Sequence, residues 1–512
     1  MEVFDHLLDL RFYMNNGLER IRNTKLHEKV MSAEQAVQLV QDGMVVGMSG
    51  FGGAGEAKTV PLALAEYAHT HPLQITLATG ASLGNKIDQK LAEANALSRR
   101  YPYQADPALR KKINNGEVMY VDQHLSSMAD DMRHHNLPRP NIAIIAAIAI
   151  TEEGQIIPTA SVGNSANFAE FADQIIVEID RTIDPVLEGA HDIYVAQSRP
   201  NRGPIPLTQS NDRIGTPGIQ VDPEKITAIV MNDIPDSSFK MDQADEETLA
   251  IAQHLIDFFE QEVALGRLPE NLGPLQSGVG SIANAVFAGF EHSNFKDLEM
   301  YSEVLQDCTF KLIDAGKMKF ASGCSMTLSE EGNAHVMNNF DRYKDKIILR
   351  PQDVSNHPEL IRRLGTISIN TALEFDIYSN VNSTHVMGTR MMNGIGGSGD
   401  FTRHAHLAIF VSKSIAKQGA ISSVVPMVSH VDHAEHDIDI LVTEQGLADL
   451  RGLTPRERAR QVIDHCAHPS YREALNDYFE RACLRGGHTP HLLHEALSWH
   501  AQFEETGHMQ AS

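Results

Sequence analysis

Cysteine and long apolar runs are scarce in this sequence. The four cysteines form no CxxC pair and lack the spacing of zinc ligands, so we expect buried thiols in a reducing compartment; they are Cys308, Cys324, Cys466 and Cys483. The longest apolar run, Ile142–Ile150, is about half of the roughly 18–20 residues that span a bilayer. The sequence therefore predicts no membrane partner, and this run is expected to be a buried strand.

Basic residues are also fewer than acidic ones. Lys and Arg number 43 against 67 Asp and Glu, which gives a formal net charge of −24. Such a surface repels polyanions, so we expect no nucleic-acid partner. The first thirty residues contain acids at Glu2, Asp5 and Asp9 and no uninterrupted apolar core, which is atypical of secretory and organelle signals. We expect a cytoplasmic location.

The apolar segments that are present alternate with helical stretches, the pattern of an α/β protein. At 512 residues the chain is longer than most domains with a single hydrophobic core, so we expect two α/β domains, 1–235 and 236–512. A weak likeness between Gly47–Gly55 and Met392–Asp400 suits related domains. An extended loop rich in Pro and Gly is expected over Pro200–Pro223. The predicted strands are Met44–Met48, Gln74–Thr79, Ile142–Ile150, Gln174–Ile179, Leu298–Ser302, Lys346–Leu349, Leu407–Val411, Ile421–Val425 and Ile438–Val442.

Two helices are predicted with clear ends. Val60–His69 carries Pro61 in its first turn, where the missing N–H costs little. Glu246–Gly266 has apolar residues at helical spacing, and its final glycine is a suitable stop. The residues that carry this second pattern are Leu249, Ala252, Ile256 and Phe259.

The segment Gly50–Gly55 follows a strand and matches GxGxxG. In a dinucleotide-binding fold such glycines let a pyrophosphate approach the backbone. That fold requires an acidic residue at the end of the next strand, whereas this strand ends in Thr79-Gly80, and Pro61 delays the helix. NAD binding is therefore a weak hypothesis.

The segment His430–Asp437, HVDHAEHD, is dense in side chains that bind metals. On a helix His430 and His433 share a face but His436 rotates away, and on a strand the three cannot converge. A polar loop before a strand explains these residues equally well. We predict no metal at the active site.

Three further segments suit anion binding or catalysis. Ser277–Phe290 has a glycine turn before a helix of small residues, which either presents N–H groups to a phosphate or permits close packing. Glu303 falls where a strand ends and a helix begins, where a carboxylate can be a base, a metal ligand or a nucleophile, or simply favour the helix dipole. Asn393–Phe401 is dense in glycine, and such loops can aim amides at an oxyanion.

Taken together in this order, these segments resemble the acetyl-CoA hydrolase/transferase family of class I CoA-transferases. The likeness covers nearly the whole chain and looks closest to succinyl-CoA:acetate and propionyl-CoA:succinate CoA-transferases. It implies two tandem, similar α/β/α domains with the active site at their interface. The motifs that carry it are VVGMSGFGGAGEAKTVP, LATGASLG, EGQIIPTASVGNS, LEGAHDIY, SGVGSIANAV, YSEVLQD, IILRPQDVSN, NVNSTHVMGT, MNGIGGSGDF and VTEQGLADLRG.

The resemblance assigns roles to individual residues. Glu303 of YSEVLQD is the expected nucleophile, Asn356 and Glu444 line its site, and Gly397 supplies an oxyanion-hole amide. Ser82 is expected near the carboxylate substrate. Where relatives tend to be basic after the strand that ends at position 231, this chain has Lys240 alone. The expected CoA contacts are Gly278, Val279, Gly280, Ser281, Ile282, Asn393, Gly397 and Lys417.

The function that the resemblance implies is ping-pong transfer of CoA between short-chain carboxylates. CoA is then the substrate and forms a γ-glutamyl thioester on Glu303, with no tightly bound cofactor, and the chain is expected to form a homodimer. The alternatives are a short-chain acyl-CoA hydrolase with the same site, a transferase for 4-hydroxybutyrate or butyrate, a CoA-responsive binding protein and a hydrolase with a metal on His430, His433 and His436. The intact motif around Glu303 counts against the binding protein, and activity that survives a chelator would count against the metal.

Overall fold

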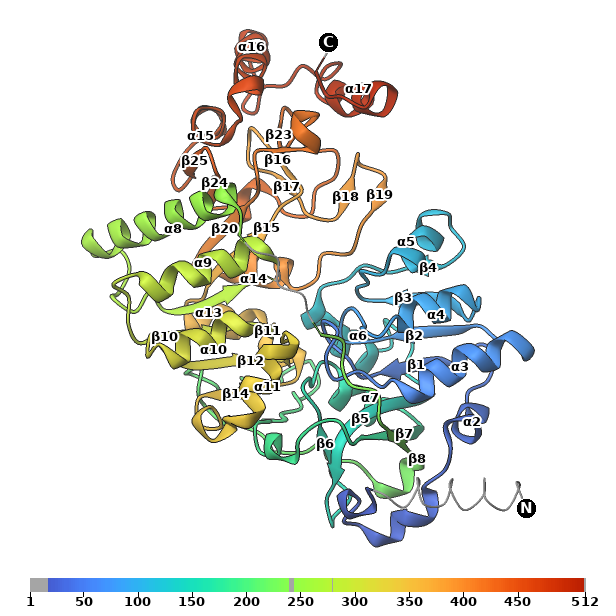
Figure 1. The fold of residues 1–512 in the computed structure, drawn as a ribbon. Helices are drawn as coiled ribbons and strands as arrows, with labels where there is room; N and C mark the ends of the chain where they lie inside the picture. The colour runs from blue at the N-terminus through green and yellow to red at the C-terminus, as the bar shows by residue number, and fades with distance from the viewer. Residues whose placement is uncertain (1–16, 239–243, 279, 511–512) are drawn as a thin grey trace. The chain divides into compact units, whose positions relative to one another are not determined.

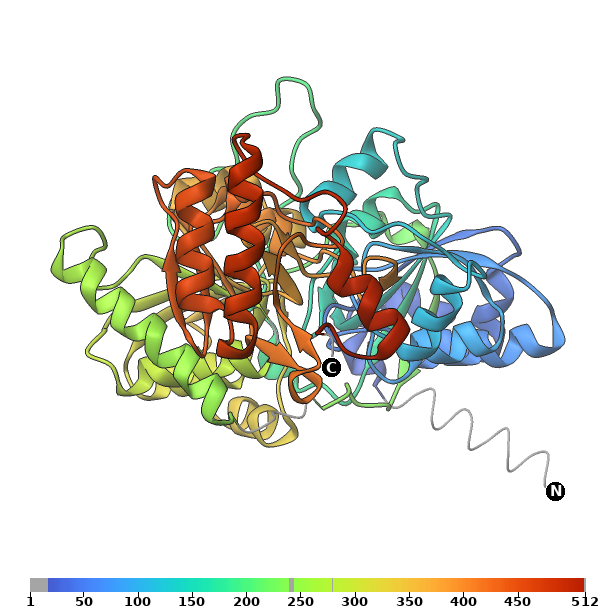
Figure 2. The ribbon, with the colours of Figure 1, turned by 90° about the horizontal axis from the view of Figure 1, so that it is seen from above.

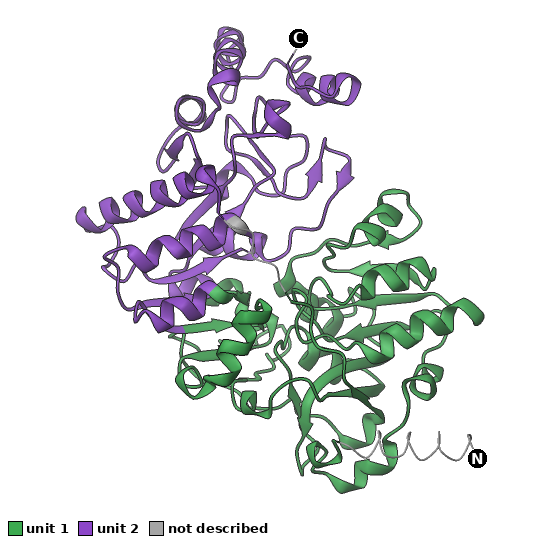
Figure 3. Cartoon of the chain, in the orientation of Figure 1, with its two compact units in different colours: residues 1–239, 302–307, 321–360 green, residues 240–301, 308–320, 361–512 purple. Residues whose placement is uncertain are grey.

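The computed structural model describes residues 17–238, 244–278 and 280–510. The chain divides into two compact units, residues 1–239, 302–307 and 321–360 in the first and 240–301, 308–320 and 361–512 in the second (Figure 3). Parallel sheets with helices packed on them confirm the predicted α/β class (Figure 1). The domain boundary at 235/236 stays a prediction, and Lys240 and Val279 lie outside the described residues.

The first unit is built on an eight-stranded sheet of order β4-β3-β2-β1-β5-β7-β8, with β6 paired to β5. The β5–β6 pair is antiparallel and the other pairs are parallel. Its strands are β1 (Val45–Met48), β2 (Ile75–Ala78), β3 (Leu97–Tyr101), β4 (Met119–Tyr120), β5 (Ile142–Ile150), β6 (Ile156–Pro158), β7 (Gln174–Asp180) and β8 (Ile226–Asn232). Its helices are α2 (Ala33–Ala36), α3 (Thr59–Thr70), α4 (Ile87–Glu93), α5 (Pro107–Asn114), α6 (Met128–Arg133), α7 (Ser165–Phe171), α11 (Glu330–Asn338) and α12 (Gln352–Ser355). The unit also holds β11 (Val304–Leu305), β13 (Ser325–Met326) and β14 (Ile347–Leu349).

Close packing explains why β1 and β5 have the sequences they do. Every residue of β5 is buried, as expected of a parallel strand covered on both faces, so its uninterrupted apolar run is confirmed as a strand. In β1, a Cβ at Gly47 would lie 2.7 Å from Cγ of Phe168 in α7. The glycine lets α7 approach the sheet. These contacts fix the strand ends from which the loops below emerge.

The second unit contains most of a second eight-stranded sheet of order β14-β12-β10-β9-β15-β20-β24-β25, in which β24 and β25 are antiparallel. Three elements cross the boundary between the units: β12 (Met318–Gly323), α10 (Asp307–Asp314) and α13 (Pro358–Leu364). The strands are β9 (Pro274–Ser277), β10 (Leu298–Tyr301), β15 (Ile367–Thr371), β16 (Glu374–Asp376), β17 (Val381–Asn382), β18 (His385–Val386), β19 (Arg390–Met391), β20 (Leu407–Val411), β21 (Ile415–Ala416), β22 (Ile421–Ser422), β23 (Val424–Val425), β24 (Ile440–Thr443) and β25 (Gly446–Asp449). The helices are α8 (Glu246–Ala264), α9 (Ser281–His292), α14 (Ser398–His404), α15 (Pro455–Cys466), α16 (Pro469–Arg485) and α17 (Ser498–Thr506). The short link between α15 and α16 makes them lie side by side (Figure 2).

Most predicted elements are confirmed to within two residues, and two predictions are wrong in part. Leu249 is 54% exposed, because the buried face of α8 is formed by Ile251, Ala252, Leu255, Ile256 and Phe259. Ile421–Val425 is not one strand. It is split into β22, which pairs with β21, and β23, which pairs with β16. The expected loop over Pro200–Pro223 contains isolated bridges and no helix or strand before Pro223.

Candidate active site

Glu303 lies between a strand and a helix, as its sequence context predicted. It follows β10 and immediately precedes β11, which pairs in parallel with β13. The backbone carbonyl of Glu303 accepts hydrogen bonds from the N–H groups of Cys324 and Ser325, at 2.7 and 3.0 Å. The backbone that carries the carboxylate is therefore fixed by two hydrogen bonds and by the short parallel ladder that follows it.

The side chain of Glu303 is held by a neutral amide. The residue is only 9% exposed, and its Oε1 accepts a hydrogen bond of 2.7 Å from Nδ2 of Asn356. Asn356 is fully buried at the end of α12. The structure thus brings together two of the residues that the sequence predicted for the site. An amide orients the carboxylate without adding a full positive charge.

The segment beneath Glu303 leaves no room for larger side chains. A Cβ at Gly323 would lie 3.0 Å from the carbonyl oxygen of Glu303 and 3.1 Å from Cγ of Leu305. The neighbouring Cys324 is fully buried, and burial together with the charge of Glu303 raises the pKa of its thiol well above the ordinary value. Cys324 is therefore held as a thiol, which is a much weaker nucleophile than a thiolate.

The glycine-rich loop of residues 50–55 packs against the Glu303 segment. Ser325 Oγ donates to the carbonyl of Phe51 at 2.9 Å, and Thr327 Oγ1 donates to the carbonyl of Gly52 at 3.1 Å. The Phe51 ring belongs to one apolar cluster with Ala81, Leu125, Val304 and Cys324. These contacts show that the glycine-rich loop packs against the segments that hold Glu303. The sequence analysis missed Ser325 and Thr327, since only their position after a strand set them apart.

The weak NAD hypothesis is contradicted by the start of α3. The N–H groups of Lys58, Thr59 and Val60 donate to the side-chain carboxylate of Glu178, at 2.5, 2.7 and 3.3 Å. Glu178 is fully buried. A carboxylate of the protein itself therefore occupies the place that a pyrophosphate takes at the helix start of a dinucleotide-binding fold.

Ser82 is half-buried in the loop after β2, and its carbonyl accepts a hydrogen bond of 3.3 Å from the N–H of Gly53. This bond links Ser82 to the glycine-rich loop that supports Glu303. Its predicted contact with the carboxylate substrate stays a prediction.

Most of the predicted CoA-binding residues that the structure describes lie in the second unit, around the starts of two helices. Gly278 and Gly280 lead from β9 into α9, Gly280 with a φ of 143°, and Ile282 is buried in the first turn. Val279 lies outside the described residues, as does the side chain of Ser281. The sequence thus correctly predicted a strand, a glycine turn and a helix here, while the contact with CoA stays a prediction.

The second helix start lies in the loop Asn393–Gly399. Gly397 is buried and stands immediately before the first residue of α14, and Asn393 is half-buried. Ser398 Oγ donates to the carbonyl of Ile395 at 2.7 Å, which closes the loop. Lys417 lies elsewhere on the unit and is exposed, with Nζ 4.9 Å from the ring centroid of Phe503.

Glu444 is a half-buried carboxylate with its own partners in the second unit. It accepts hydrogen bonds from the N–H of Ser414 at 2.8 Å, from Ser414 Oγ and from Gln445 Nε2 at 3.0 Å. Burial acts to raise the pKa of Glu444, but the bonds from Ser414 and Gln445 outweigh it and hold the pKa below its ordinary value. Glu444 is therefore an ionised, fixed acceptor at neutral pH.

Comparison with known proteins assigns the chain to a family. Residues 14–231 match the acetyl-CoA hydrolase/transferase N-terminal domain, and residues 332–479 match the acetyl-CoA hydrolase/transferase C-terminal domain. The chain belongs to the acetyl-CoA hydrolase/transferase family. The resemblance found in the motifs is thereby confirmed, and the chain is an enzyme of this family.

Its relatives carry two kinds of name. The chain is 52% identical to a succinyl-CoA:acetate CoA-transferase of Clostridium kluyveri, over 96% of this chain and 92% of the relative. It is 44% identical to a propanoyl-CoA:succinate CoA transferase of Escherichia coli, over 94% and 98%. It is also 47% identical to an acetyl-CoA hydrolase of Schizosaccharomyces pombe, over 96% and 98%. The family thus includes transferases and hydrolases.

Solved structures show the same fold. RipA from Yersinia pestis superposes with a TM-score of 0.69 at 22% identity, covering 89% of this chain and 97% of that one. A 4-hydroxybutyrate CoA-transferase from Porphyromonas gingivalis gives a TM-score of 0.61 at 21% identity, covering 89% and 98%. Among the helices of the described residues, none combines the length and the apolar character needed to cross a membrane.

Proposed function

We propose that this enzyme transfers CoA between short-chain carboxylates through a γ-glutamyl-CoA thioester on Glu303. The observation that carries the proposal is the buried Glu303 carboxylate, fixed by the β11–β13 ladder and hydrogen-bonded at 2.7 Å to the amide of Asn356. A carboxylate is a weak nucleophile, so most of its reactivity must come from fixed orientation and exclusion of water. Glu303 has both.

The reaction that these residues support is a double displacement. An oxygen of Glu303 attacks the acyl carbonyl of the acyl-CoA, and the C–S bond breaks to give a mixed anhydride and CoA thiolate. The thiolate then attacks the glutamyl carbonyl, and the bond to the acyl oxygen breaks to release the first carboxylate. A second carboxylate enters and the steps run in reverse. Because the complete cycle exchanges one thioester for another and one free carboxylate for another, it needs no net proton, electron or ATP.

Asn356 suits the glutamyl half of this cycle. Each attack on the Glu303 carbonyl carbon places negative charge on a glutamyl oxygen, and Oε1 already accepts from Nδ2 of Asn356. A donor placed where charge develops stabilises the transition state, and removal of one such donor typically costs about 10²–10³ in rate. For attack on the acyl carbonyl, the resemblance assigns the amide that stabilises the oxyanion to Gly397.

The proposed substrates come from the names of the relatives. Succinyl-CoA with acetate is the first candidate pair and propionyl-CoA with succinate the second. CoA contacts are proposed for the glycine turn at 278–282 and for Asn393, Gly397 and Lys417. No tightly bound cofactor is required, and a homodimer is proposed from the resemblance alone.

A second candidate function is hydrolysis of acetyl-CoA. The fungal relatives named acetyl-CoA hydrolases favour it, and the same glutamyl thioester would then be resolved by water. The two functions require the same residues and differ in the acceptor.

The experiment that separates them uses purified protein, succinyl-CoA and isotopically labelled acetate. A transferase forms labelled acetyl-CoA in step with the loss of succinyl-CoA and releases little free CoA. A hydrolase releases free CoA at the same rate with and without acetate. Formation of labelled acetyl-CoA at less than a tenth of the rate of CoA release would reject the proposed transfer in favour of hydrolysis.

A further inference from the structure

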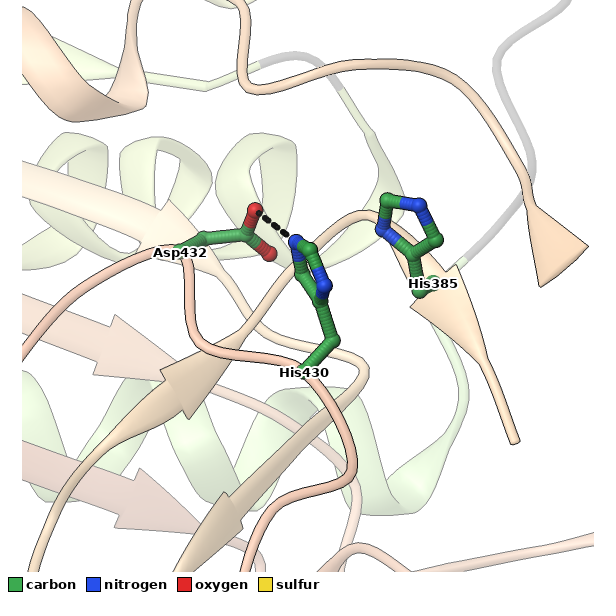
Figure 4. A group of neighbouring side chains, drawn as sticks. All are labelled: His385, His430 and Asp432. Carbon is green, nitrogen blue, oxygen red and sulfur yellow. Dashed lines mark ion pairs between the residues drawn. The ribbon is translucent and has the colours of Figure 1, made fainter. Parts of the chain in front are cut away.

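A second cluster of reactive side chains lies in the second unit, on two chain segments that are joined by backbone pairing. His385 begins β18, and His430 and Asp432 follow β23 (Figure 4). The N–H of Val381 donates to the carbonyl of His433 at 2.8 Å, and the N–H of Asp432 donates to the carbonyl of Val381 at 2.9 Å. The two segments therefore present the three side chains from a fixed scaffold.

The three side chains point toward one another. The His385 and His430 rings have centroids 3.8 Å apart with an interplanar angle of 33°, and Nε2 of His430 lies 3.3 Å from Oδ1 of Asp432 (Figure 4). One ligand atom from each of the three residues lies within 4.8 Å of the other two. The side chain of His430 is 37% exposed, so an ion from solvent can reach the cluster.

The hydrogen bonds of Thr384 fix the tautomer of His385. The Thr384 hydroxyl has a single hydrogen, which it donates to the Asp432 carboxylate at 2.8 Å. Its oxygen also lies 2.6 Å from Nδ1 of His385 and must therefore accept the Nδ1–H of that ring. Nε2 of His385 is left with its lone pair available for a ligand. Metal-binding histidines are oriented by outer-shell bonds of this kind.

Asp432 is positioned in the same way. Its carboxylate accepts from the N–H of Ser383 at 2.6 Å as well as from Thr384, and its side chain is only 4% exposed. The Asp432 carboxylate is therefore held in one orientation beside the two imidazoles.

We propose that His385, His430 and Asp432 form a binding site for one divalent transition-metal ion of the zinc type. Two imidazoles and one carboxylate are ligands that Zn²⁺ accepts readily, whereas Mg²⁺ and Ca²⁺ prefer all-oxygen sites. Bond lengths of about 2.0–2.2 Å require ligand atoms about 3.3 Å apart, so the side chains must close inward by about 1.5 Å at most. Water completes the four-coordinate shell.

This site differs from the one that the sequence suggested. His433 is buried, with its ring 4.7 Å from that of Phe410 and Nε2 3.2 Å from Ser398 Oγ, and His436 is exposed in a neighbouring turn. In the proposed site the second histidine ligand is His385, 45 positions before His430, rather than His433 or His436. The absence of a metal at the active site stays a prediction, and the proposed transfer chemistry routes no step through a metal.

A bound ion would tie the β18–β19 hairpin to the segment after β23. The hairpin leads through Met392, whose N–H donates to the carbonyl of Thr384 at 2.8 Å, directly into the Asn393–Gly399 loop. The ion therefore stabilises the base of that loop. It binds the folded state alone, so it raises the unfolding temperature of the full chain.

The test is equilibrium dialysis of the full-length protein, stripped with a chelator, against ZnCl₂, followed by metal analysis. The variants are His385→Ala and His430→Ala, and the control is His436→Ala, which removes an exposed histidine of the same segment. We expect the wild type to bind one more Zn²⁺ per chain than either site variant. The site variants should bind Zn²⁺ at least tenfold more weakly, and the control should bind it as the wild type does. Mg²⁺ should not compete.

A thermal melt of each protein with and without Zn²⁺ gives an independent readout. Zn²⁺ should raise the midpoint of the wild type and of His436→Ala, and not that of the site variants. Because His430 is half-exposed, His430→Ala is expected to fold even if His385→Ala does not. Equal Zn²⁺ binding by wild type and His430→Ala, or no binding by wild type, would overturn the proposal and leave the proposed transfer function unaffected.

Discussion

Glu303 and Glu262 are both buried glutamates, one in each unit, but they are held by different partners. Glu262 in α8 is bound by the guanidinium groups of Arg267 and Arg451, with Arg451 Nη1 at 2.8 Å. These bonds, from Arg451 above all, lower its pKa to about 2. Glu303 accepts from the neutral amide of Asn356. Paired guanidinium groups stabilise the carboxylate as it stands, whereas the amide of Asn356 orients Glu303 through a neutral donor.

The largest expected effect is the loss of Glu303 itself. Glu303→Gln removes the nucleophile, so CoA transfer should fall by a factor on the order of 10⁴ or more. The measurement is the rate of acetyl-CoA formation from succinyl-CoA and acetate, with the exposed Glu331→Gln in the same unit as control. Retention of more than a few per cent of the activity by a freshly purified Glu303→Gln protein would remove Glu303 from the mechanism.

The next effect concerns the donor to Glu303. Asn356→Ala should lower kcat by about 10²-fold and leave KM for succinyl-CoA within about twofold, because the bond strengthens as charge develops on the glutamyl oxygen. Steady-state kinetics measure both constants, with exposed Asn338→Ala as the matched control. If KM rises while kcat is kept, Asn356 serves substrate binding rather than the chemical step.

Glu262 should show the opposite pattern. Glu262→Gln leaves two arginines without their shared anion and should lower the free energy of unfolding by about 2 kcal/mol. Activity per folded molecule should not change. Urea unfolding measures the change in the free energy of unfolding, with the exposed Glu260→Gln as the control, and kcat measures the activity. A loss of kcat without a loss of stability would show that the comparison with Glu303 is mistaken.

A third buried glutamate predicts a dependence on pH. Burial, assisted by the charge of Asp236, raises the pKa of Glu56 to about 8 from its ordinary 4.5. The folded chain therefore holds a proton that the unfolded chain has lost between these values, and stability should fall as the pH rises from 4.5 to 8, by up to about 1.4 kcal/mol per pH unit. Urea unfolding at several pH values should show this slope, and Glu56→Gln should reduce it. An unchanged slope in the variant would contradict the assignment to Glu56.

The sequence predicted the elements whose pattern is set locally. The apolar run of β5 and the first turn of α3, which contains Pro61, are examples, because each is marked by residues adjacent in the chain. The predicted apolar face of α8 was right at Ala252, Ile256 and Phe259 and wrong at Leu249, which is exposed although its spacing fits the pattern. The split between β22 and β23 depends on which strands they pair with, which no local pattern encodes.

The candidate site, too, was predicted only in part from the sequence. Glu303 and Asn356 were found through motifs, and the structure adds the 2.7 Å bond between them. The contact of Ser325 with the carbonyl of Phe51, 274 positions away, has no signal in one sequence. His385 was missed for the same reason, because its link to His430 and Asp432 exists only once two distant segments pair.

The most direct test of the account is to trap the glutamyl thioester. The protein is incubated with succinyl-CoA alone and treated with borohydride, which reduces a thioester to an alcohol and leaves a carboxylate intact, and its peptides are then mapped by mass spectrometry. The account predicts reduction at Glu303 in wild type, none at Glu331, and none at position 303 when acetate in excess has discharged the enzyme first. An unmodified Glu303 in protein that is turning over succinyl-CoA would contradict covalent transfer through this residue.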